Sequence, residues 1–196
     1  AGTAEEILYL LGILLDPENA QQPMPVILTG PKDSGAYFER IAQFVEGTLG
    51  RAALSRLRIV PGDPAEAARE MSHALEEVRE HRRRVNDSYN FNWLLRIRPD
   101  FLLPFEVTHD SMRALDLHLG QPPCQLAANL RRAFSGIVTG NVKEHGIKAI
   151  EAHGPYELSG DPGVMRLLDD LLRAFVAQGR MKLPGSEYKP CYRLAG

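Results

Sequence analysis

The spacing of apolar and polar residues predicts helices that alternate with short strands over the first 85 residues. A first helix is expected from Thr3 to Leu15, with apolar side chains around most of its circumference. Such a helix is buried on two sides, commonly between a sheet and a partner subunit. The apolar run at 26–29 stops at Gly30-Pro31, which is typical of a buried strand in a parallel sheet, and a second short strand is expected over 57–60, before Pro61-Gly62. A second helix is expected over 37–49.

The segment after the second strand predicts a long helix. Asp63 is a favoured N-cap residue, and Pro64 suits the first helical position. The side chains expected to face inward are three or four residues apart: Ala68, Met71, Leu75 and Val78. Three helices and two strands joined by short links indicate an α/β fold, namely the rear half of a doubly wound parallel sheet.

The pattern changes near Val85. Residues 87–105 are rich in aromatic residues and broken by prolines, and we interpret these aromatics as the core of a small domain. A long helical pattern follows over 123–153, with Gly146 as the expected point of division, and another covers 164–177. We therefore predict two domains: an α/β region over 1–85 and a smaller, mainly helical region over 86–196.

Composition excludes several classes of protein. The 196 residues carry a formal net charge of −2, so no strong basic field indicates a nucleic acid or an anionic lipid as partner. The longest apolar run, 7–15, is far shorter than the ~20 residues that a membrane span needs. The two cysteines and six histidines show no metal-ligand spacing. We expect a cytoplasmic protein with no cofactor, no metal and no nucleic-acid or membrane partner.

The start of the first helix carries the strongest candidate chemistry. Gly2 allows a ligand to approach the backbone closely, and the free amides at a helix N-terminus favour an anion. Thr3 can cap the helix or bind a phosphate oxygen, and Glu6 lies one turn further along. The spacing of Thr3 and Glu6 equally fits a capping box, and spacing alone favours that structural interpretation.

The stretch AGTAEE at residues 1–6 resembles the second part of the Pro-Gly-Gly-x-Gly-Thr-x-x-Glu signature of the "Lonely guy" family of nucleotide phosphoribohydrolases. Residues 1 to about 84 then resemble the last strands and helices of that family's Rossmann-like fold. The chain enters this helix without an initiator Met or a leading strand, so we expect it to be the C-terminal part of a longer protein.

Later segments resemble the C-terminal region of the long form of this family, the bacterial pyrimidine/purine nucleotide 5′-monophosphate nucleosidases. They are FNW at 91–93, NLRRAFSGIV at 129–138, GNVKE at 140–144, RMKLPG at 180–185 and PCY at 190–192. The resemblance therefore spans essentially the whole chain. It also implies that the upstream half supplies the Pro-Gly-Gly and an active-site arginine, so we expect the 196-residue chain alone to be inactive.

The resemblance implies hydrolysis of a nucleoside monophosphate to a free base and ribose 5-phosphate. Cleavage of an N-glycosidic bond passes through an oxocarbenium-like sugar, which needs a carboxylate nearby. The resemblance gives that catalytic role to Glu6 and places the 5′-phosphate on Gly2 and Thr3. Glu5 points about 100° away on the helix, and we expect it to contact the protein or a neighbouring subunit.

Several basic residues have two open interpretations. Arg82 and Arg83 end a predicted helix, where cations favour the helix dipole and solvent, or they bind a phosphorylated effector. The resemblance implies that this effector is guanosine tetra- or pentaphosphate. Four more are either solvated surface or contacts to substrate or effector: Arg131, Arg132, Lys143 and Lys182.

Two other functions stay open at this point. One is a non-catalytic nucleotide or alarmone sensor, because the fold binds phosphates whether or not it hydrolyses anything. The other is a cytokinin-activating phosphoribohydrolase, against which the long C-terminal region counts. The first helix, apolar on most of its circumference, also predicts a homo-oligomer, a dimer or a tetramer.

Overall fold

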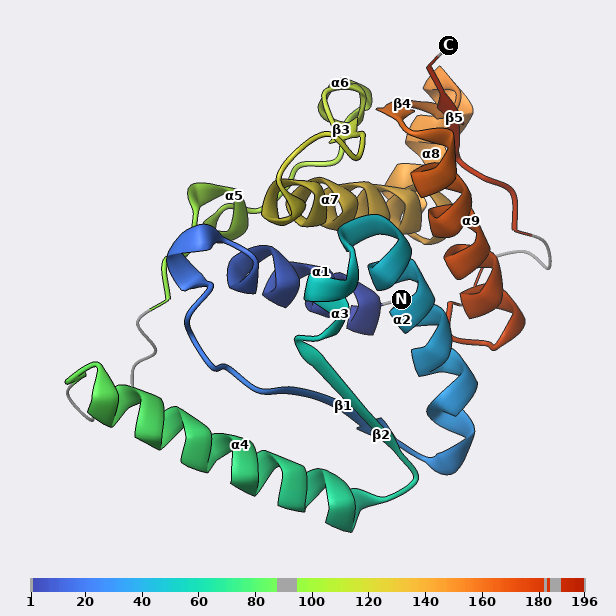
Figure 1. The fold of residues 1–196 in the computed structure, drawn as a ribbon. Coiled ribbons are helices and arrows are strands. Elements are labelled where there is room, and N and C mark those ends of the chain that lie inside the picture. Colours follow the sequence, from blue (N-terminus) through green and yellow to red (C-terminus); the bar gives the residue numbers. More distant parts are fainter. Residues whose placement is uncertain (1, 88–94, 182, 184–187, 196) are drawn as a thin grey trace.

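The computed structural model describes residues 2–87, 95–181, 183 and 188–195. Apart from the short helix α3, its first elements follow the predicted order of helices and strands (Figure 1). They are α1 (Gly2–Leu14), β1 (Val26–Gly30), α2 (Gly35–Leu49), α3 (Arg51–Leu54), β2 (Leu57–Pro61) and α4 (Pro64–Arg84), with 3₁₀ turns at Pro17–Asn19 and Lys32–Ser34. The predicted elements of this region are confirmed, with ends shifted by one or two residues.

The strands β1 and β2 form a parallel sheet, and α2 lies in the connection between them. Val26 pairs with Leu57 at one end of the sheet. At the other end the Thr29 hydroxyl donates a hydrogen bond of 2.9 Å to the Val60 carbonyl. Among the described residues no third strand joins this pair, so the structure establishes a small parallel α/β unit here.

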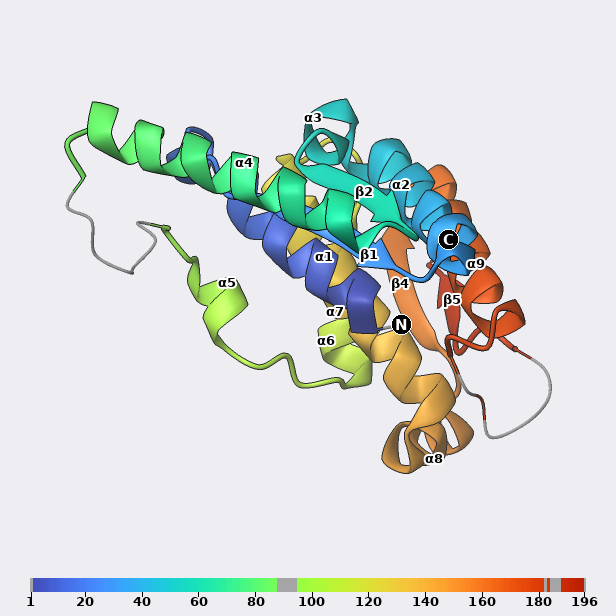
Figure 2. The same cartoon turned by 90° about the horizontal axis from the view of Figure 1, so that it is seen from below.

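The helix α4 begins as predicted, because the Asp63 carboxylate accepts an amide hydrogen bond of 2.8 Å in the first turn. The prediction for its inward face is wrong at two positions. Ala68 is exposed and Leu75 is 37% exposed, whereas Val78 and the neighbouring Ala67 are buried. A two-stranded sheet is too narrow to cover more of this helix, and the rest of α4 extends beyond it (Figure 2).

The region after residue 95 is mainly helical, as predicted, but it also contains a parallel sheet. Its helices are α5 (Pro99–Leu102), α6 (His109–Arg113), α7 (Pro123–Val142), α8 (Glu144–His153) and α9 (Pro162–Ala177). Its strands pair in chain order: β3 (Asp116–Leu117), β4 (Tyr156–Gly160) and β5 (Tyr192–Leu194). The sequence analysis missed this sheet, because strands of two, five and three residues are too short to display a clear period.

The long helical pattern is divided, but before Gly146. Lys143 has an extended conformation between the end of α7 and the start of α8. Gly146 is buried against α7, where an added Cβ would lie 2.3 Å from the Thr139 carbonyl oxygen. This glycine therefore sets how closely α8 packs on α7 and not where the helix breaks.

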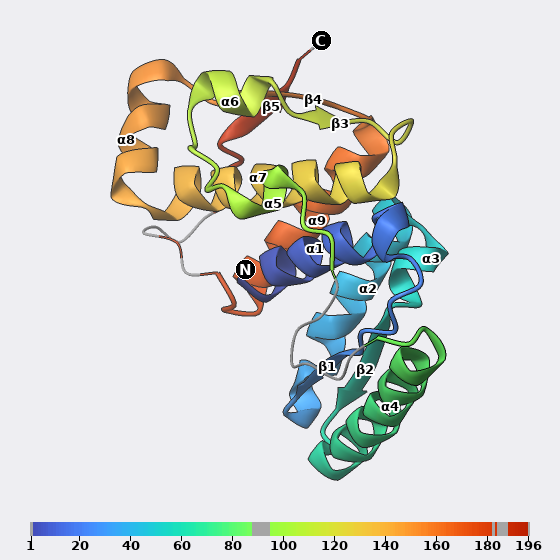
Figure 3. The same cartoon turned by 90° about the vertical axis from the view of Figure 1, so that its left-hand side faces the viewer.

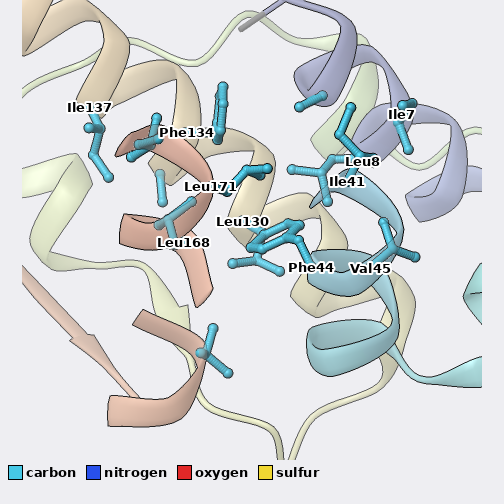
Figure 4. Close-up of a cluster of buried hydrophobic side chains, with 14 of the residues drawn as sticks. Ile7, Leu8, Ile41, Phe44, Val45, Leu130, Phe134, Ile137, Leu168 and Leu171 are labelled. Carbon is cyan, nitrogen blue, oxygen red and sulfur yellow. The ribbon is translucent and has the colours of Figure 1, made fainter. Parts of the chain in front are cut away.

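The main hydrophobic core lies where α1, α2, α7 and α9 meet (Figure 4). Figure 4 shows Leu8 of α1, Ile41 of α2, Leu130 and Phe134 of α7 and Leu171 of α9 in one cluster, and each is 2% exposed or less. Helices from both sides of residue 85 thus contribute to one core. The division into two domains at that residue stays a prediction.

The helix α1 is buried around most of its circumference, as its composition predicts. It runs antiparallel to α7 and packs along it (Figures 1 and 3). Ile7, Leu8, Leu11 and Leu14 are each 2% exposed or less. Elements of the same chain cover these side chains, so their burial does not depend on a second subunit.

Candidate functional site

A pocket of about 600 Å³ begins at the start of α1 and follows one face of that helix. Five residues of α1 and one residue of α7 line it: Gly2, Glu5, Glu6, Tyr9, Leu10 and Arg131. Each of the α1 residues lies three or four positions from another residue of the set, so all five share one face of the helix. The volume is within the range of small-molecule sites, about 300–1,000 Å³.

The first turn of α1 can hold an anion at the start of this pocket. The first amides of a helix have no partner within it and carry partial positive charge. Gly2 is exposed, and open space surrounds the point where a Cβ would lie. No side chain of the described residues therefore crowds the backbone at Gly2.

Thr3 does not form the capping box that its spacing with Glu6 allowed. The helix begins at Gly2, so Thr3 lies inside the first turn and not at the N-cap. Between these two described residues there is no hydrogen bond. Thr3 is exposed, and its side chain lies outside the lining of the pocket.

Two glutamate side chains line the pocket. Glu6 is exposed and Glu5 is half-buried, and both line it. In the part of the chain that the structure describes, neither forms an ion pair. Glu5 was expected to point away from the site, but it lines the pocket. The pocket extends to both sides of the line from Gly2 to Tyr9.

Arg131 forms the α7 wall of the pocket. Its guanidinium carbon lies 5.1 Å from the centre of the Tyr9 ring, in a cation–π arrangement. The Tyr9 ring meets Phe101 edge-on, with ring centres 5.4 Å apart. The structure therefore brings one of the basic candidates of the sequence, Arg131, into the pocket that contains Glu6.

Phe101 of α5 packs against Tyr9, and α5 lies beside α1 and α7 (Figure 3). The buried Asn19 side chain both donates to and accepts from the backbone of Arg96, at 2.8 Å each. Phe101 lies so close to Gly12 that a Cβ there would be 2.2 Å from its ring. Tyr9 packs against the small hydrophobic cluster that contains Phe101, so the position of its ring is fixed.

Other basic candidates lie outside the lining of this pocket. The Arg132 guanidinium carbon lies 5.8 Å from the centre of the Phe105 ring. Lys143 is exposed between α7 and α8, which fits a solvated surface position. Lys182 lies outside the described residues. The structure thus separates Arg131 from Arg132 and Lys143.

The arginines at the end of α4 lie away from the start of α1 in two views (Figures 1 and 2). Arg82 Nε lies 3.6 Å from Asp87 Oδ2, and these side chains are only 13% and 14% exposed. Arg83 is exposed in the same last turn. Cations here interact favourably with the C-terminal end of the helix dipole.

A second hollow, of about 420 Å³, lies between α4 and the start of the β1–β2 sheet. Its arginines already have partners: Arg58 pairs with Glu70 at 3.1 Å, and Arg56 donates to the carbonyls of Ala20 and Gln22. Because these charges are satisfied within the protein, the pocket on α1 is the stronger candidate site.

Neither a metal cluster nor a membrane-spanning helix is present among the described residues. There, no three His, Cys, Asp or Glu side chains come together in a way that could hold a metal ion. No helix in the same part of the chain is both long and apolar enough to cross a membrane.

Tyr9 and Leu10 were not predicted to belong to the site, and Glu5 was expected to have another role. Helical spacing contains the signal for all three, because their positions share a face with Gly2. No such signal exists for Arg131, since its approach to Tyr9 depends on how α7 packs against α1.

Comparison with known proteins agrees with the resemblance noted in the sequence. Residues 75–195 match the family described as "Pyrimidine/purine nucleotide monophosphate nucleosidase, C-terminal". Curated proteins named "Pyrimidine/purine nucleotide 5′-monophosphate nucleosidase" from Escherichia coli strains K12, O6:H1 and O157:H7 are each 56% identical over 193 residues. The alignments cover 98% of this chain and 42% of each relative, so the chain spans less than half of their length. The chain therefore belongs to the pyrimidine/purine nucleotide monophosphate nucleosidase family and corresponds to its C-terminal portion.

Proposed function

We propose that this chain is the C-terminal part of an enzyme that hydrolyses the N-glycosidic bond of nucleoside 5′-monophosphates. The products are a free base and ribose 5-phosphate, and the proposed substrates are AMP, GMP, CMP and UMP. The observation that carries the proposal is a pocket in which Glu6 lies beside helix amides suited to a phosphate. The name of the curated relatives supports the same activity.

In the proposed reaction, the bond between C1′ of the ribose and the base nitrogen breaks. The base leaves with the electron pair of that bond, so positive charge develops on C1′ and the ring oxygen. The Glu6 carboxylate stabilises this charge and accepts a proton from the water whose oxygen bonds to C1′. That proton ends on the departing base, which leaves as a neutral molecule.

The 5′-phosphate is proposed to lie on the amides of Gly2 and Thr3. The unpartnered N–H groups and the positive end of the helix dipole both favour an anion there. A phosphate held at the first turn fixes the ribose over Glu6, one turn along the same helix. Fixing the sugar in this way lowers the barrier by orientation as well as by charge.

We propose further that residues 1–85 belong to a Rossmann-like domain that upstream chain completes, and that residues 86–196 form the C-terminal domain of the family. The parallel β1–α2–β2 unit supports this, because such units build doubly wound sheets. A domain of that kind binds its ligand at the carboxyl ends of parallel strands and at helix N-termini.

Regulation by guanosine tetra- or pentaphosphate and assembly into a dimer or tetramer are also proposed. Arg82 and Arg83 are the candidate effector contacts, since arginine binds phosphate through two parallel hydrogen bonds. Assembly is supported by two neighbouring apolar side chains, Leu102 and Leu103, which are 62% and 67% exposed. Apolar side chains that gather on an exposed surface favour subunit contacts.

The test compares base release by the full-length protein and its Glu6→Gln variant, with the exposed Glu39→Gln of α2 as matched control. We expect Glu6→Gln to lower kcat by about 10²- to 10⁴-fold, because it removes both the negative charge and the proton acceptor. The control should keep the wild-type rate. Light scattering and a parallel assay with guanosine tetraphosphate test the assembly and the regulation.

Base release by Glu6→Gln at close to the wild-type rate would contradict the role of Glu6. Nucleotide binding by the wild-type protein without base release would instead indicate a sensor. A monomer in light scattering, or a rate unaffected by guanosine tetraphosphate, would remove the corresponding part of the proposal and leave the chemistry standing.

A further inference from the structure

We propose that the base of the nucleotide lies at the far end of the α1 pocket, against Tyr9 and Leu10 and beside the guanidinium of Arg131. This inference rests on the proposed function and adds the part of the site that recognises the base. It makes Arg131 a base-binding residue that the C-terminal region of the family contributes to the pocket.

The order of chemical groups along α1 matches the order of groups in a nucleoside monophosphate. The free amides lie at Gly2, the Glu6 carboxylate lies four residues further on, and the Tyr9 ring lies seven residues further on. At 1.5 Å per residue these steps are about 6 Å and 10 Å along the helix axis. Anion site, carboxylate and aromatic ring therefore follow one another as phosphate, ribose and base do.

The far end of the pocket has the composition that a base requires. Tyr9 and Leu10 offer an apolar edge, and the Arg131 guanidinium offers a flat cation with five N–H donors. Bases stack on aromatic rings and on guanidinium planes, and this stacking tolerates every base because each has a π-face. Each of the four common bases also has a ring nitrogen or a carbonyl oxygen that accepts a hydrogen bond. A site of this kind takes purines and pyrimidines alike.

The free amides of α1 favour the phosphate at the start of the pocket and leave the far end to the base. Within the described residues Arg131 has no carboxylate partner, and it lines the pocket over the Tyr9 ring. A phosphate at this end would lie away from the free amides of the first turn, which favour an anion. A neutral base needs no such amides and leaves the phosphate at the favourable end.

The far end is also rigid before a ligand arrives. Tyr9 is held edge-on by Phe101, and Phe101 itself is 5% exposed and seated on Gly12. Arg131 lies one turn after the buried Ala128, which belongs to the same small cluster as Phe101. Because these side chains are already ordered, binding does not lose their conformational freedom.

The test uses the full-length protein and measures KM for AMP and UMP together with inhibition by ribose 5-phosphate, which has no base. We expect Arg131→Gln to raise KM on the order of 10-fold to 100-fold with a smaller change in kcat. The inhibition constant of ribose 5-phosphate should stay within about twofold. Arg131→Lys, which keeps the charge but loses the plane, should resemble Arg131→Gln, and the exposed Arg166→Gln of α9 is the control.

Tyr9 provides the second variant. We expect Tyr9→Phe, which keeps the ring, to behave as wild type and Tyr9→Leu to raise KM as Arg131→Gln does. A parallel rise of the ribose 5-phosphate constant would overturn the inference, because it would place Arg131 on the phosphate. An unchanged KM in both Arg131→Gln and Tyr9→Leu would overturn it as well.

The proposed function can fail separately from this inference. Calorimetric binding of AMP and of ribose 5-phosphate to the Glu6→Gln protein, with and without Arg131→Gln, needs no turnover. If Arg131→Gln weakens the binding of AMP and leaves the binding of ribose 5-phosphate unchanged, the base contact is supported. This holds even where the wild-type protein releases no base. Equal losses for both ligands contradict it.

Discussion

Cys191 shows how burial decides the chemistry of a single side chain in this protein. It is 5% exposed, and its sulfur accepts a hydrogen bond of 3.1 Å from Asn141 Nδ2. Burial raises the pKa of the Cys191 thiol to about 12. The sulfur also fills the space above Gly140, where an added Cβ would lie 2.7 Å away. Cys191 is therefore a packing residue and not a nucleophile.

At pH 8 a thiol with a pKa of about 12 is ionised in roughly one molecule in 10⁴, and only the thiolate reacts. We expect Cys191 to resist iodoacetamide in the native protein at pH 8 and to react readily in concentrated urea. Peptide mass spectrometry of the labelled full-length protein measures both. Native labelling at the rate of a free cysteine would contradict the burial of this thiol.

At the same scale, the sequence contained part of the candidate site. Gly2 and Glu6 could be singled out because a short motif and a helix start place them together. Glu5 and Tyr9 lie on the same helical face and could have been included by spacing. Arg131 was a candidate without a distinguishing signal, because its contact with Tyr9 joins residues far apart in the chain.

At the scale of elements, the junction of α7 and α8 depends on one small residue. The Cβ of any other residue at Gly146 would lie 2.3 Å from a backbone oxygen of α7, Thr139 O, which cannot move aside like a side chain. Gly163, in the first turn of α9, has open space around the same point. Gly146 and Gly163 are therefore a matched pair: both lie in helices, and only Gly146 lacks room for a Cβ.

We expect Gly146→Ala to destabilise the protein by about 1–3 kcal/mol, because overpacking outweighs the gain in helix propensity. Gly163→Ala should be neutral or slightly stabilising, since it gains propensity without a clash. Urea unfolding followed by circular dichroism measures the free energy of unfolding of both variants. Equal stability of the two variants would show that α8 does not pack on α7 as described.

Elements were predictable where a local pattern fixed them. α1, β1, α2 and β2 follow from apolar periodicity and from glycine and proline at their ends, and α4 follows from the Asp63 cap. The inward face of α4 was not predictable, because it depends on the width of the sheet beneath it. The β3–β4–β5 sheet joins strands that are short and distant in sequence, so no local pattern indicates it.

At the scale of the whole molecule, the site lies where the two predicted regions meet. The face of α1 supplies the amides, the carboxylates and the ring, and α7 supplies Arg131. The shared core of α1, α2, α7 and α9 holds these two walls together. The family match begins at residue 75, inside α4, and not at a loop between domains.

The central claim is that a bond to the base, and not a bond to the phosphate, is hydrolysed. The most direct measurement incubates the full-length protein with AMP and UMP and separates the quenched products by chromatography. We predict free base and ribose 5-phosphate in equal amounts, with no nucleoside. Nucleoside with inorganic phosphate, or no product from either nucleotide, would contradict the account.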